Sequence, residues 1–195
     1  MTDRRTIDVY QAKAQDYVAM GLSSEQAGVI ADFVARLPRP ALVLDLGCGP
    51  GIHAAEMMRA GVSVDAVDAT PAFVAEAQGR GVPARLAGFE DITGTDLYDG
   101  IWASFSLLHA RKADVPRHID ALATALKPGG VLYLGMKLGE GEERDSIGRH
   151  YSYFSEEELV AMLGQVRLNV VFRATGRDRG LSGEIAPYIH LIADA

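Results

Sequence analysis

The feature that most constrains the fold is an apolar segment running into glycines, Val43-Leu44-Asp45-Leu46-Gly47-Cys48-Gly49-Pro50-Gly51. The apolar part predicts a buried strand, and the alternating glycines permit the positive φ of a tight turn and let a ligand approach the backbone. A helical pattern starts directly after the turn, so its free N–H groups would point at whatever the turn holds. In open α/β sheets, nucleotides bind in this crevice.

A second feature, the acid Asp68, falls at the end of the next predicted strand, 21 residues after Gly47. A carboxylate at that place can accept hydrogen bonds from both hydroxyls of a ribose. The alternative is a tight turn beside an unrelated surface acid. Because the turn and the acid occur together at the spacing that a nucleotide site requires, the pair favours nucleotide binding.

The glycine pattern also discriminates between nucleotides. The chain has G-x-G-x-G where a dinucleotide site has G-x-G-x-x-G, and Asp45 lies two residues before the first glycine. A fixed carboxylate would repel a pyrophosphate by roughly a few kcal/mol at an effective dielectric near 20. S-adenosylmethionine has no phosphate and carries a positive sulfonium and a positive ammonium. The acid therefore favours S-adenosylmethionine.

Strand-like and helical patterns alternate along the chain, which predicts a doubly wound α/β fold with a mostly parallel sheet. Ser23 and Gln26 form the pattern of a capping box before the second helix, and Ser155 and Glu158 do the same before the last. The predicted helices are 6–21, 24–37, 51–60, 71–79, 114–126 and 155–164, and the predicted strands are 41–46, 62–67, 83–87, 100–104, 131–136, 166–173 and 186–193. The strand over 166–173 alternates apolar and polar residues, which is typical of an antiparallel edge.

Length and composition narrow the class of protein. The 195 residues suffice for one sizeable α/β domain and not for two, and no apolar run is long enough to cross a bilayer. The net charge of −7, with scattered Lys and Arg, argues against nucleic acid as a substrate. One cysteine, Cys48, excludes an internal disulfide and a zinc-like cysteine pattern, and the N-terminus has no apolar signal core. We therefore expect a cytoplasmic protein without a metal site or a membrane partner.

Four motifs resemble the class I S-adenosylmethionine-dependent methyltransferases, most of all the small bacterial branch that acts on small molecules. They are Leu44-Asp45-Leu46-Gly47-Cys48-Gly49-Pro50-Gly51, Val64-Asp65-Ala66-Val67-Asp68, Tyr98-Asp99-Gly100-Ile101-Trp102 and Leu126-Lys127-Pro128-Gly129-Gly130. The resemblance implies a Rossmann-like, seven-stranded, mostly parallel sheet with an antiparallel C-terminal hairpin and the strand order 3-2-1-4-5-7-6. We expect one domain over 1–195, with a helical cap or lid over 1–37 and a cofactor-binding core over 38–195.

The resemblance also implies roles for individual residues. Asp45, Gly47 and Gly49 would line the methionine part of the cofactor, Asp68 would bind the ribose, and Ala69 would border the adenine. Phe89, Glu90 and Asp91 follow the third strand, where the family contacts adenine. Many members have Gly-Asp where this chain has Gly88-Phe89, so Glu90 or Asp91 would supply the polar contact and Phe89 would pack on the ring. Ser104 and Phe105 would lie near the reacting methyl group.

Two further residues are counted with the cofactor site. Tyr17 either belongs to a lid over the cofactor, together with Tyr10, or simply packs the N-terminal helix. Cys48 lies in the turn itself as a small packing residue. The predicted cofactor-binding residues are therefore Tyr17, Asp45, Gly47, Cys48, Gly49, Asp68, Ala69, Phe89, Glu90, Asp91 and Ser104.

Methyl transfer needs an aligned nucleophile, and an acid–base pair is not obligatory. His109, just beyond the strand over 100–104, is the candidate catalytic base because a neutral imidazole can remove a proton near pH 7. The alternative is a polar residue that ends a loop. His150 and Tyr151, in the long loop over 138–154, are candidates for contacting substrate.

Three basic residues follow the fifth strand: Lys137, Arg144 and Arg149. One hypothesis is that they hold an anionic substrate such as a carboxylate. The alternative is that they are solvated loop charges that balance Glu140, Glu142 and Glu143.

The favoured function is methyl transfer to a small-molecule acceptor by a monomer or homodimer. The other readings are a protein or nucleic-acid methyltransferase, an NAD-type oxidoreductase, and a non-catalytic module that only binds the cofactor. Enzymes of this superfamily that methylate base amines tend to carry [Asn/Asp]-Pro-Pro-aromatic after strand four, whereas this chain has Ser104-Phe105-Ser106-Leu107.

Overall fold

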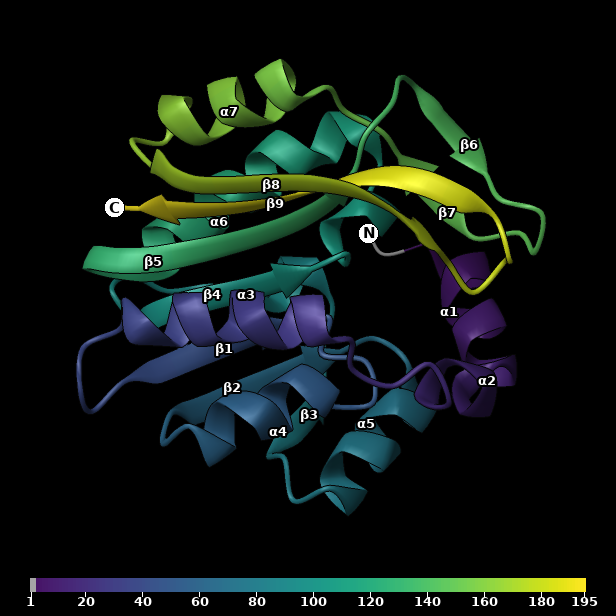
Figure 1. Cartoon of the computed structure of the whole chain (residues 1–195), viewed down its shortest axis with the longest axis horizontal. Coiled ribbons are helices and arrows are strands. Elements are labelled where there is room, and N and C mark those ends of the chain that lie inside the picture. The colour runs from purple at the N-terminus through teal and green to yellow at the C-terminus, as the bar shows by residue number, and fades with distance from the viewer. Residues whose placement is uncertain (1–2) are drawn as a thin grey trace.

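The computed structural model describes residues 3–195 and shows a central sheet with helices on both faces (Figure 1). Met1 and Thr2, which fall in the predicted cap, lie outside the described residues. The α-helices are α1 (Arg4–Ala12), α2 (Ala14–Val18), α3 (Ser24–Ala35), α4 (Ile52–Arg59), α5 (Pro71–Gly79), α6 (Val115–Ala125) and α7 (Glu156–Gln165). Short 3₁₀ helices are η1 (Phe89–Asp91), η2 (Leu107–His109) and η3 (Lys112–Asp114). The strands are β1 (Leu42–Leu46), β2 (Ser63–Asp68), β3 (Ala84–Leu86), β4 (Tyr98–Ser104), β5 (Leu126–Lys137), β6 (Glu142–Arg144), β7 (His150–Ser152), β8 (Asn169–Arg179) and β9 (Ile185–Asp194).

The seven-stranded sheet has the order β3-β2-β1-β4-β5-β9-β8. Strands β1 to β5 are parallel, and β9 runs antiparallel between β5 and β8. With β6 and β7 set aside as a separate two-stranded sheet, this is the predicted order 3-2-1-4-5-7-6, so the fold class is confirmed. The chain changes direction across the sheet between β1 and β4, and the crevice at their carboxyl ends is the place where such folds bind ligands.

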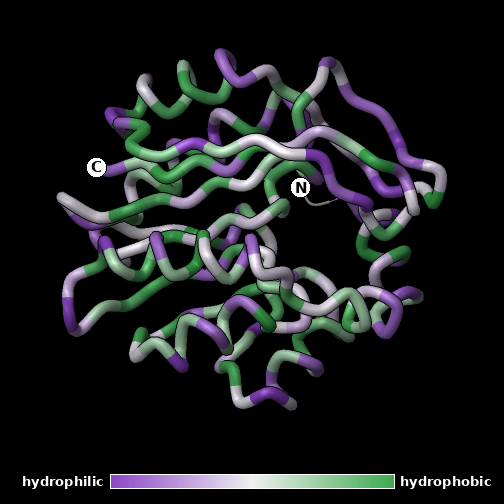
Figure 2. The backbone as a smooth tube through the Cα atoms, viewed as in Figure 1, coloured by the Kyte–Doolittle hydropathy of each residue, from purple (hydrophilic) through white to green (hydrophobic). Residues whose placement is uncertain are grey.

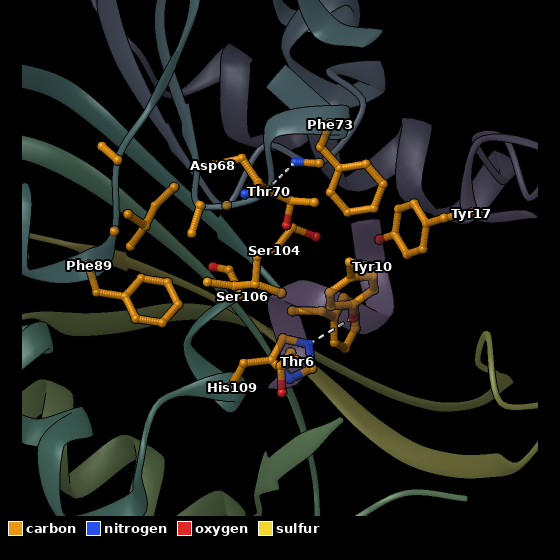
Figure 3. A pocket seen from close by; sticks show the side chains of 18 residues that line it. Thr6, Tyr10, Tyr17, Asp68, Thr70, Phe73, Phe89, Ser104, Ser106 and His109 are labelled. Atoms are coloured by element: carbon orange, nitrogen blue, oxygen red, sulfur yellow. Dashed lines mark hydrogen bonds between the residues drawn. The ribbon is translucent and has the colours of Figure 1, made fainter. Parts of the chain in front are cut away.

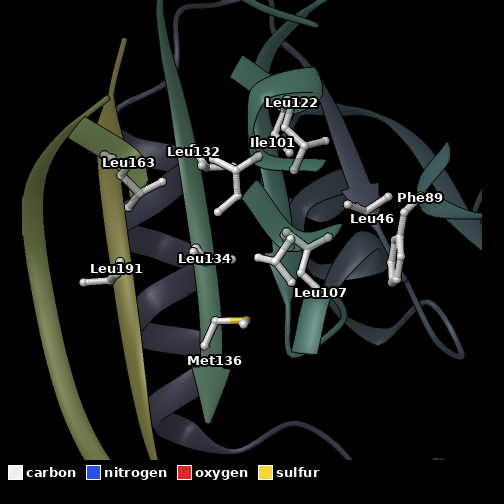
Figure 4. Close-up of a cluster of buried hydrophobic side chains, with 14 of the residues drawn as sticks. Leu46, Phe89, Ile101, Leu107, Leu122, Leu132, Leu134, Met136, Leu163 and Leu191 are labelled. Carbon is white, nitrogen blue, oxygen red and sulfur yellow. The ribbon is translucent and has the colours of Figure 1, made fainter. Parts of the chain in front are cut away.

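Alternating side chains of the strands feed two apolar layers, as the pleat of a sheet requires. Ile101 and Ala103 of β4 join the cluster under α6 and α7, part of which Figure 4 shows. Trp102, between them, joins the cluster under α3, α4 and α5. Both faces of the sheet are therefore covered, which is why its inner strands are almost continuously apolar.

The helix starts at α3 and α7 are the predicted capping boxes. The Ser23 hydroxyl accepts from the Gln26 N–H, and the Ser155 hydroxyl accepts from the Glu158 N–H. Thr70 precedes α5 as expected, with Pro71 in the first turn, but its side chain makes no capping hydrogen bond. Its backbone N–H is instead bound by a carboxylate of the site described below.

Two predicted segments at the ends of the chain differ from the structure. The single helix over 6–21 is wrong, since Lys13 leaves the helical region (φ −111°, ψ 20°) and separates α1 from α2. The strand expected over 166–173 starts only at Asn169, because Val166 ends α7 and Arg167 has a φ of 63°. It then continues to Arg179, paired with β9 along its whole length.

The other differences lie at β5. The Pro128-Gly129-Gly130 turn expected before this strand is part of it, because Leu126 already pairs with Tyr98. The loop over 138–154 contains the antiparallel pair β6 and β7. All three residues of β6 are exposed, and the strand is hydrophilic in Figure 2, so no apolar pattern marks it. Within residues 3–195, no helix combines the length and apolar character needed to cross a bilayer.

We expect Gly100→Ala to destabilise the protein by about 1–3 kcal/mol, because overpacking a filled core forces its neighbours to move. A Cβ at Gly100 in β4 would lie 2.7 Å from Cδ2 of Leu37 and 2.8 Å from Cζ of Phe33. The matched control is Gly28→Ala in α3, where a Cβ meets nothing within 4 Å. That change should be neutral or stabilising by up to about 1 kcal/mol. Denaturant unfolding checks both, and equal effects would contradict the packing argument.

Candidate active site

A cavity lies at the carboxyl ends of β1, β2 and β4, with α1 and α2 at the same edge of the sheet (Figures 1 and 3). Phe89 lies on one side of it, and Phe73 and Tyr17 lie on the opposite side (Figure 3). Seven predicted cofactor residues line this cavity: Tyr17, Gly47, Gly49, Asp68, Ala69, Phe89 and Ser104. The candidate base His109 lines it too. Residues far apart in the sequence thus meet where the glycine turn predicted a ligand site.

The glycine turn needs its glycines. Gly47, Gly49 and Gly51 have φ values of 73°, 53° and 78°, a region that other residues rarely adopt. A Cβ at Gly47 would collide with Ser106, and one at Gly51 would lie 2.7 Å from the Cβ of Ala77. The turn can therefore pack closely against β4 and α5 only because these side chains are missing.

Asp68 connects the turn to the end of β2. Its Oδ2 accepts from the Gly49 N–H at 2.9 Å, and its Oδ1 accepts from the Thr70 N–H at 2.7 Å. Burial raises the pKa of Asp68, and these two N–H groups act in the opposite direction. The Thr70 side chain and the Ala69 N–H act in the same direction as these two donors, so several donors hold the carboxylate in the cavity wall.

Asp45 lies behind the turn rather than in the wall of the cavity, and it is 1% exposed. Its Oδ2 has no hydrogen-bond partner among residues 3–195. Burial and the nearby charge of Asp68 raise the pKa of Asp45 to about 8. No Lys, Arg or His among the described residues forms an ion pair with either acid. Two buried carboxylates without a cation make this site attractive to a positively charged ligand.

The N-terminal helices contribute an aromatic wall. Ring centroids are 5.7 Å apart for Tyr10 and Tyr17, 5.4 Å for Tyr10 and Phe73, and 5.2 Å for Tyr17 and Phe73. The Gln11 side chain accepts from the Ala72 N–H and fastens α1 to the start of α5. The break at Lys13 has a physical reason here, since the turn brings Tyr10 of α1 and Tyr17 of α2 onto the same side of Phe73.

His109, in η2, is buried and has both ring nitrogens engaged. Nδ1 lies 2.6 Å from the His150 carbonyl oxygen, which can only accept, so Nδ1 carries the proton. Nε2, 2.8 Å from the Tyr10 hydroxyl, then accepts from it. The same hydroxyl accepts from Nη1 of Arg149 at 2.8 Å. Burial lowers the pKa of His109 to about 3, so the imidazole is neutral at physiological pH.

Four predicted cofactor residues are absent from the wall of this cavity: Asp45, Cys48, Glu90 and Asp91. Cys48 is buried and borders a neighbouring cavity on the other side of the turn. Asp91 accepts from the Gly88 N–H at 2.7 Å and so closes its own 3₁₀ turn. The contact of Glu90 or Asp91 with adenine stays a prediction.

Among the lining residues that the sequence reasoning missed are Thr6, Phe73 and Ser106. The hydroxyl of Ser106 is buried without a hydrogen-bond partner among residues 3–195, so it is available to a ligand. The position of Ser106, two residues after Ser104, was the available signal. Thr6 and Phe73 carry no motif, and only the packing of α1 on α5 brings them to the site.

A second cavity adjoins the first on the side of β5, β8 and β9. Tyr10, Tyr17, Phe105 and His109 line both cavities. Phe105 has a φ of 52°, an uncommon conformation for a bulky residue and one often found where function requires it. The two cavities therefore adjoin, with Phe105 at their junction.

The three basic residues after β5 have different partners. Arg144 pairs with Asp3 at 2.8 Å, and Arg149 pairs with Asp145 at 2.7 Å. Arg144 and Arg149 therefore neither share an anion site with Lys137 nor balance the neighbouring glutamates, because each pairs with an aspartate. Lys137 remains in the second cavity, with Nζ 4.1 Å from the ring centroid of Tyr151.

Asp45→Asn should stabilise the ligand-free protein at pH 9 and do so much less at pH 5. The folded pKa of about 8 exceeds the ordinary value of 3.8, so the wild type loses stability as the pH rises from near 4 to about 8, with the full loss present at pH 9, and asparagine does not. Melting temperatures of both proteins at the two pH values provide the measurement.

The control is Asp99→Asn, whose sign should be opposite. Although burial raises the pKa of Asp99, hydrogen bonds from Lys127 and the Leu42 N–H outweigh it and lower that pKa. This ionised acid stabilises the fold at high pH, so its removal should lower the melting temperature at pH 9. Equal shifts for both variants would contradict the assignment of an uncompensated charge to Asp45.

Comparison with known proteins places this geometry in a family. Residues 21–177 match a family model described as a methyltransferase domain. A ubiquinone biosynthesis O-methyltransferase of Xanthomonas axonopodis pv. citri is 37% identical over 109 residues, which are 51% of this chain and 45% of that protein. A tRNA U34 carboxymethyltransferase of Shewanella sp. (strain ANA-3) is 31% identical over 110 residues, 52% of this chain and 33% of that protein. The chain spans less than half the length of each of these two relatives.

Solved structures share the fold. The Burkholderia thailandensis 1,6-didemethyltoxoflavin-N1-methyltransferase, bound to 1,6-didemethyltoxoflavin and S-adenosylhomocysteine, has a TM-score of 0.75 and 24% identity, covering 97% of this chain and 87% of that one. Magnesium protoporphyrin IX methyltransferase from Synechocystis PCC 6803, bound to S-adenosylmethionine, has a TM-score of 0.67 and 20% identity, covering 96% and 80%. Because the family model matches well over half of the chain, and the fold agrees with that of the solved methyltransferases, the chain belongs to the methyltransferase domain family.

Proposed function

We propose that this chain transfers a methyl group from S-adenosylmethionine to a small-molecule acceptor. The observation that carries the proposal is the pair of buried carboxylates, Asp45 and Asp68, without a cationic partner among the described residues at the glycine turn. A sulfonium and an ammonium would be stabilised there and would favour the ionised form of Asp45, whereas the pyrophosphate of NAD would gain no attraction from either acid. The charge of the site thus argues against the oxidoreductase alternative.

The residues present fit this cofactor. Gly47 and Gly49 would border the methionine part with Asp45 behind them, and Asp68, in the cavity wall, would accept from the ribose hydroxyls. Ala69 and Phe89 line the part of the cavity proposed for adenine. When bound, the cofactor supplies an activated methyl carbon and its leaving group.

The chain's own contribution would be to align the acceptor and keep water out. We assign the second role to α1 and α2, as a cap whose Tyr10 and Tyr17 close against Phe73. His109 is the proposed base, and its neutral state suits that role. Since its Nε2 already accepts from Tyr10, an acceptor must displace the Tyr10 hydroxyl before it can give up a proton to Nε2.

A small acceptor is favoured over RNA. The ubiquinone and tRNA enzymes named above differ in substrate class, so relatives alone leave the acceptor open. The second cavity is lined by aromatic side chains and adjoins the proposed cofactor site, which suits a small molecule that is held within the protein. The net charge of −7 opposes binding to a phosphate backbone.

We expect calorimetry to show binding of S-adenosylhomocysteine and no binding of NADH. Asp68→Ala should weaken S-adenosylhomocysteine binding at least tenfold, because it removes the proposed ribose ligand and releases the Gly49 turn. Asp65→Ala, an acid on the same strand that pairs with Arg85, is the matched control and should bind normally. Tighter binding of NADH than of S-adenosylhomocysteine would contradict the proposal.

Incubation of a cell extract with the protein and an isotopically labelled methyl donor should label molecules that pass a filter retaining proteins and nucleic acids. His109→Ala should lower that transfer about a hundredfold or more while S-adenosylhomocysteine binding stays within a few-fold of wild type. Label retained with protein or RNA would instead select a macromolecular acceptor. Cofactor binding without any labelled product would indicate the non-catalytic alternative.

A further inference from the structure

We infer that the acceptor is a small aromatic anion, a ring that carries a carboxylate or a group of like charge, and that Lys137 binds this charge in the second cavity. The inference rests on the proposed function and adds the chemical class of the acceptor. It follows from three features of the cavity: an unbalanced cation, an aromatic floor and a size that suits one ring.

The cation is Lys137, at the end of β5. Its Nζ lies 4.1 Å from the Tyr151 ring centroid, and the guanidinium carbon of Arg149 lies 5.2 Å from the same centroid. Asp145 pairs with Arg149, and both side chains are 2% exposed. Lys137 forms no ion pair within residues 3–195. This end of the cavity thus holds two cations and one paired carboxylate, an arrangement that an anionic ligand would stabilise.

No acid among residues 3–195 forms an ion pair with Lys137, although the charges of Asp145, Glu184 and Glu143 act on it from a greater distance. Both carboxylate oxygens of Glu25 accept from the Tyr188 hydroxyl at 2.8 Å. Asp178 and Arg179 are exposed neighbours of opposite charge on β8. Burial and the charge of Arg149 lower the pKa of Lys137, so a negative charge placed beside it would be favourable. Of the three basic residues singled out in the sequence, Lys137 is therefore the one left to bind substrate.

The aromatic floor comes from the pairing of β5 with β9. Gly135 lies opposite His190, and Lys137 lies opposite Tyr188, so these two pairs share one face of the sheet. A Cβ at Gly135 would be 3.3 Å from Cε2 of Phe105, so the missing side chain makes room for that ring. Phe105 also contacts the rings of Tyr188 and His190, at 5.9 and 5.7 Å between centroids.

The spacing matches an aryl carboxylate. Two residues along a strand span about 7 Å, so Lys137 lies about that far along β5 from the Gly135 position where Phe105 packs. A ring resting on Phe105 could thus place its carboxylate near Nζ. The cavity measures about 130 Å³, close to the roughly 150 Å³ of an apolar cavity known to hold benzene.

The position of the anion also restricts which atom receives the methyl group. Lys137 lines only the second cavity, whereas Phe105 and His109 line both. With its charge at Lys137, the acceptor would present the opposite end of its ring to the cofactor site. The methylated atom is then a ring substituent or ring atom at that end, and the charged group itself is not methylated.

Benzoate and its neutral counterpart benzamide test the inference, each titrated by calorimetry into protein saturated with S-adenosylhomocysteine. Benzoate should bind at least tenfold more tightly than benzamide. Lys137→Met should remove that preference, and Lys137→Arg should keep most of it. Arg36→Met, which deletes an exposed positive charge at the end of α3, should match the wild type.

The outcomes separate the two proposals. Failure to bind S-adenosylhomocysteine would count against the proposed function, and benzoate and benzamide are then titrated into the protein alone. If S-adenosylhomocysteine binds but benzoate does not bind, or binds no better than benzamide, the aromatic-anion inference is overturned while the methyltransferase assignment stands. An unchanged benzoate preference in Lys137→Met, with a thermal melt like that of the wild type, would also overturn it.

Discussion

The site depends on one hydrogen bond, from the Gly49 N–H to the Asp68 carboxylate. It joins the turn after β1 to the end of β2, and the N–H groups of Gly47 and Cys48 reinforce the junction by donating to the Val67 carbonyl oxygen. A carboxylate held in this way cannot swing out to water, so it stays in the wall of the cavity. The geometry of a ribose site is then set before any ligand arrives, which lowers the entropy cost of binding.

Burial of this junction also determines its electrostatics. Asp45 lies behind the turn, and with Asp68 beside it the ionised form is disfavoured. A cation in the cavity would reverse that preference, so ligand charge and protein charge are coupled. The same logic recurs with opposite sign in the second cavity, where Lys137 and Arg149 flank Tyr151. Adjoining cavities of opposite charge suit a cationic donor and an anionic acceptor.

The parts of the fold that local patterns control could be predicted from the sequence. Glycines with required positive φ, the acid after β2 and the capping serines are short-range signals, and each lies where expected. The break at Lys13 and the β6–β7 pair could not be predicted, because they depend on contacts with distant segments. Arg144 illustrates this, since its partner Asp3 lies 141 positions away. The charge of Lys137 was visible in the sequence, but only the structure shows that it lines the second cavity without an ion pair among residues 3–195.

The contacts of α1 join it to the segment that contains β6 and β7. There are three such contacts: Asp3, which caps α1, pairs with Arg144, the Thr6 hydroxyl accepts from the His150 N–H, and the Tyr10 hydroxyl accepts from Arg149. Because Thr6 and Tyr10 also line the first cavity, these contacts hold part of its wall in place. The outermost tie is an ion pair near water, which dissolved salt weakens. Raising the ionic strength would thus loosen the attachment of α1 to the β6–β7 segment, and with it this part of the cavity wall.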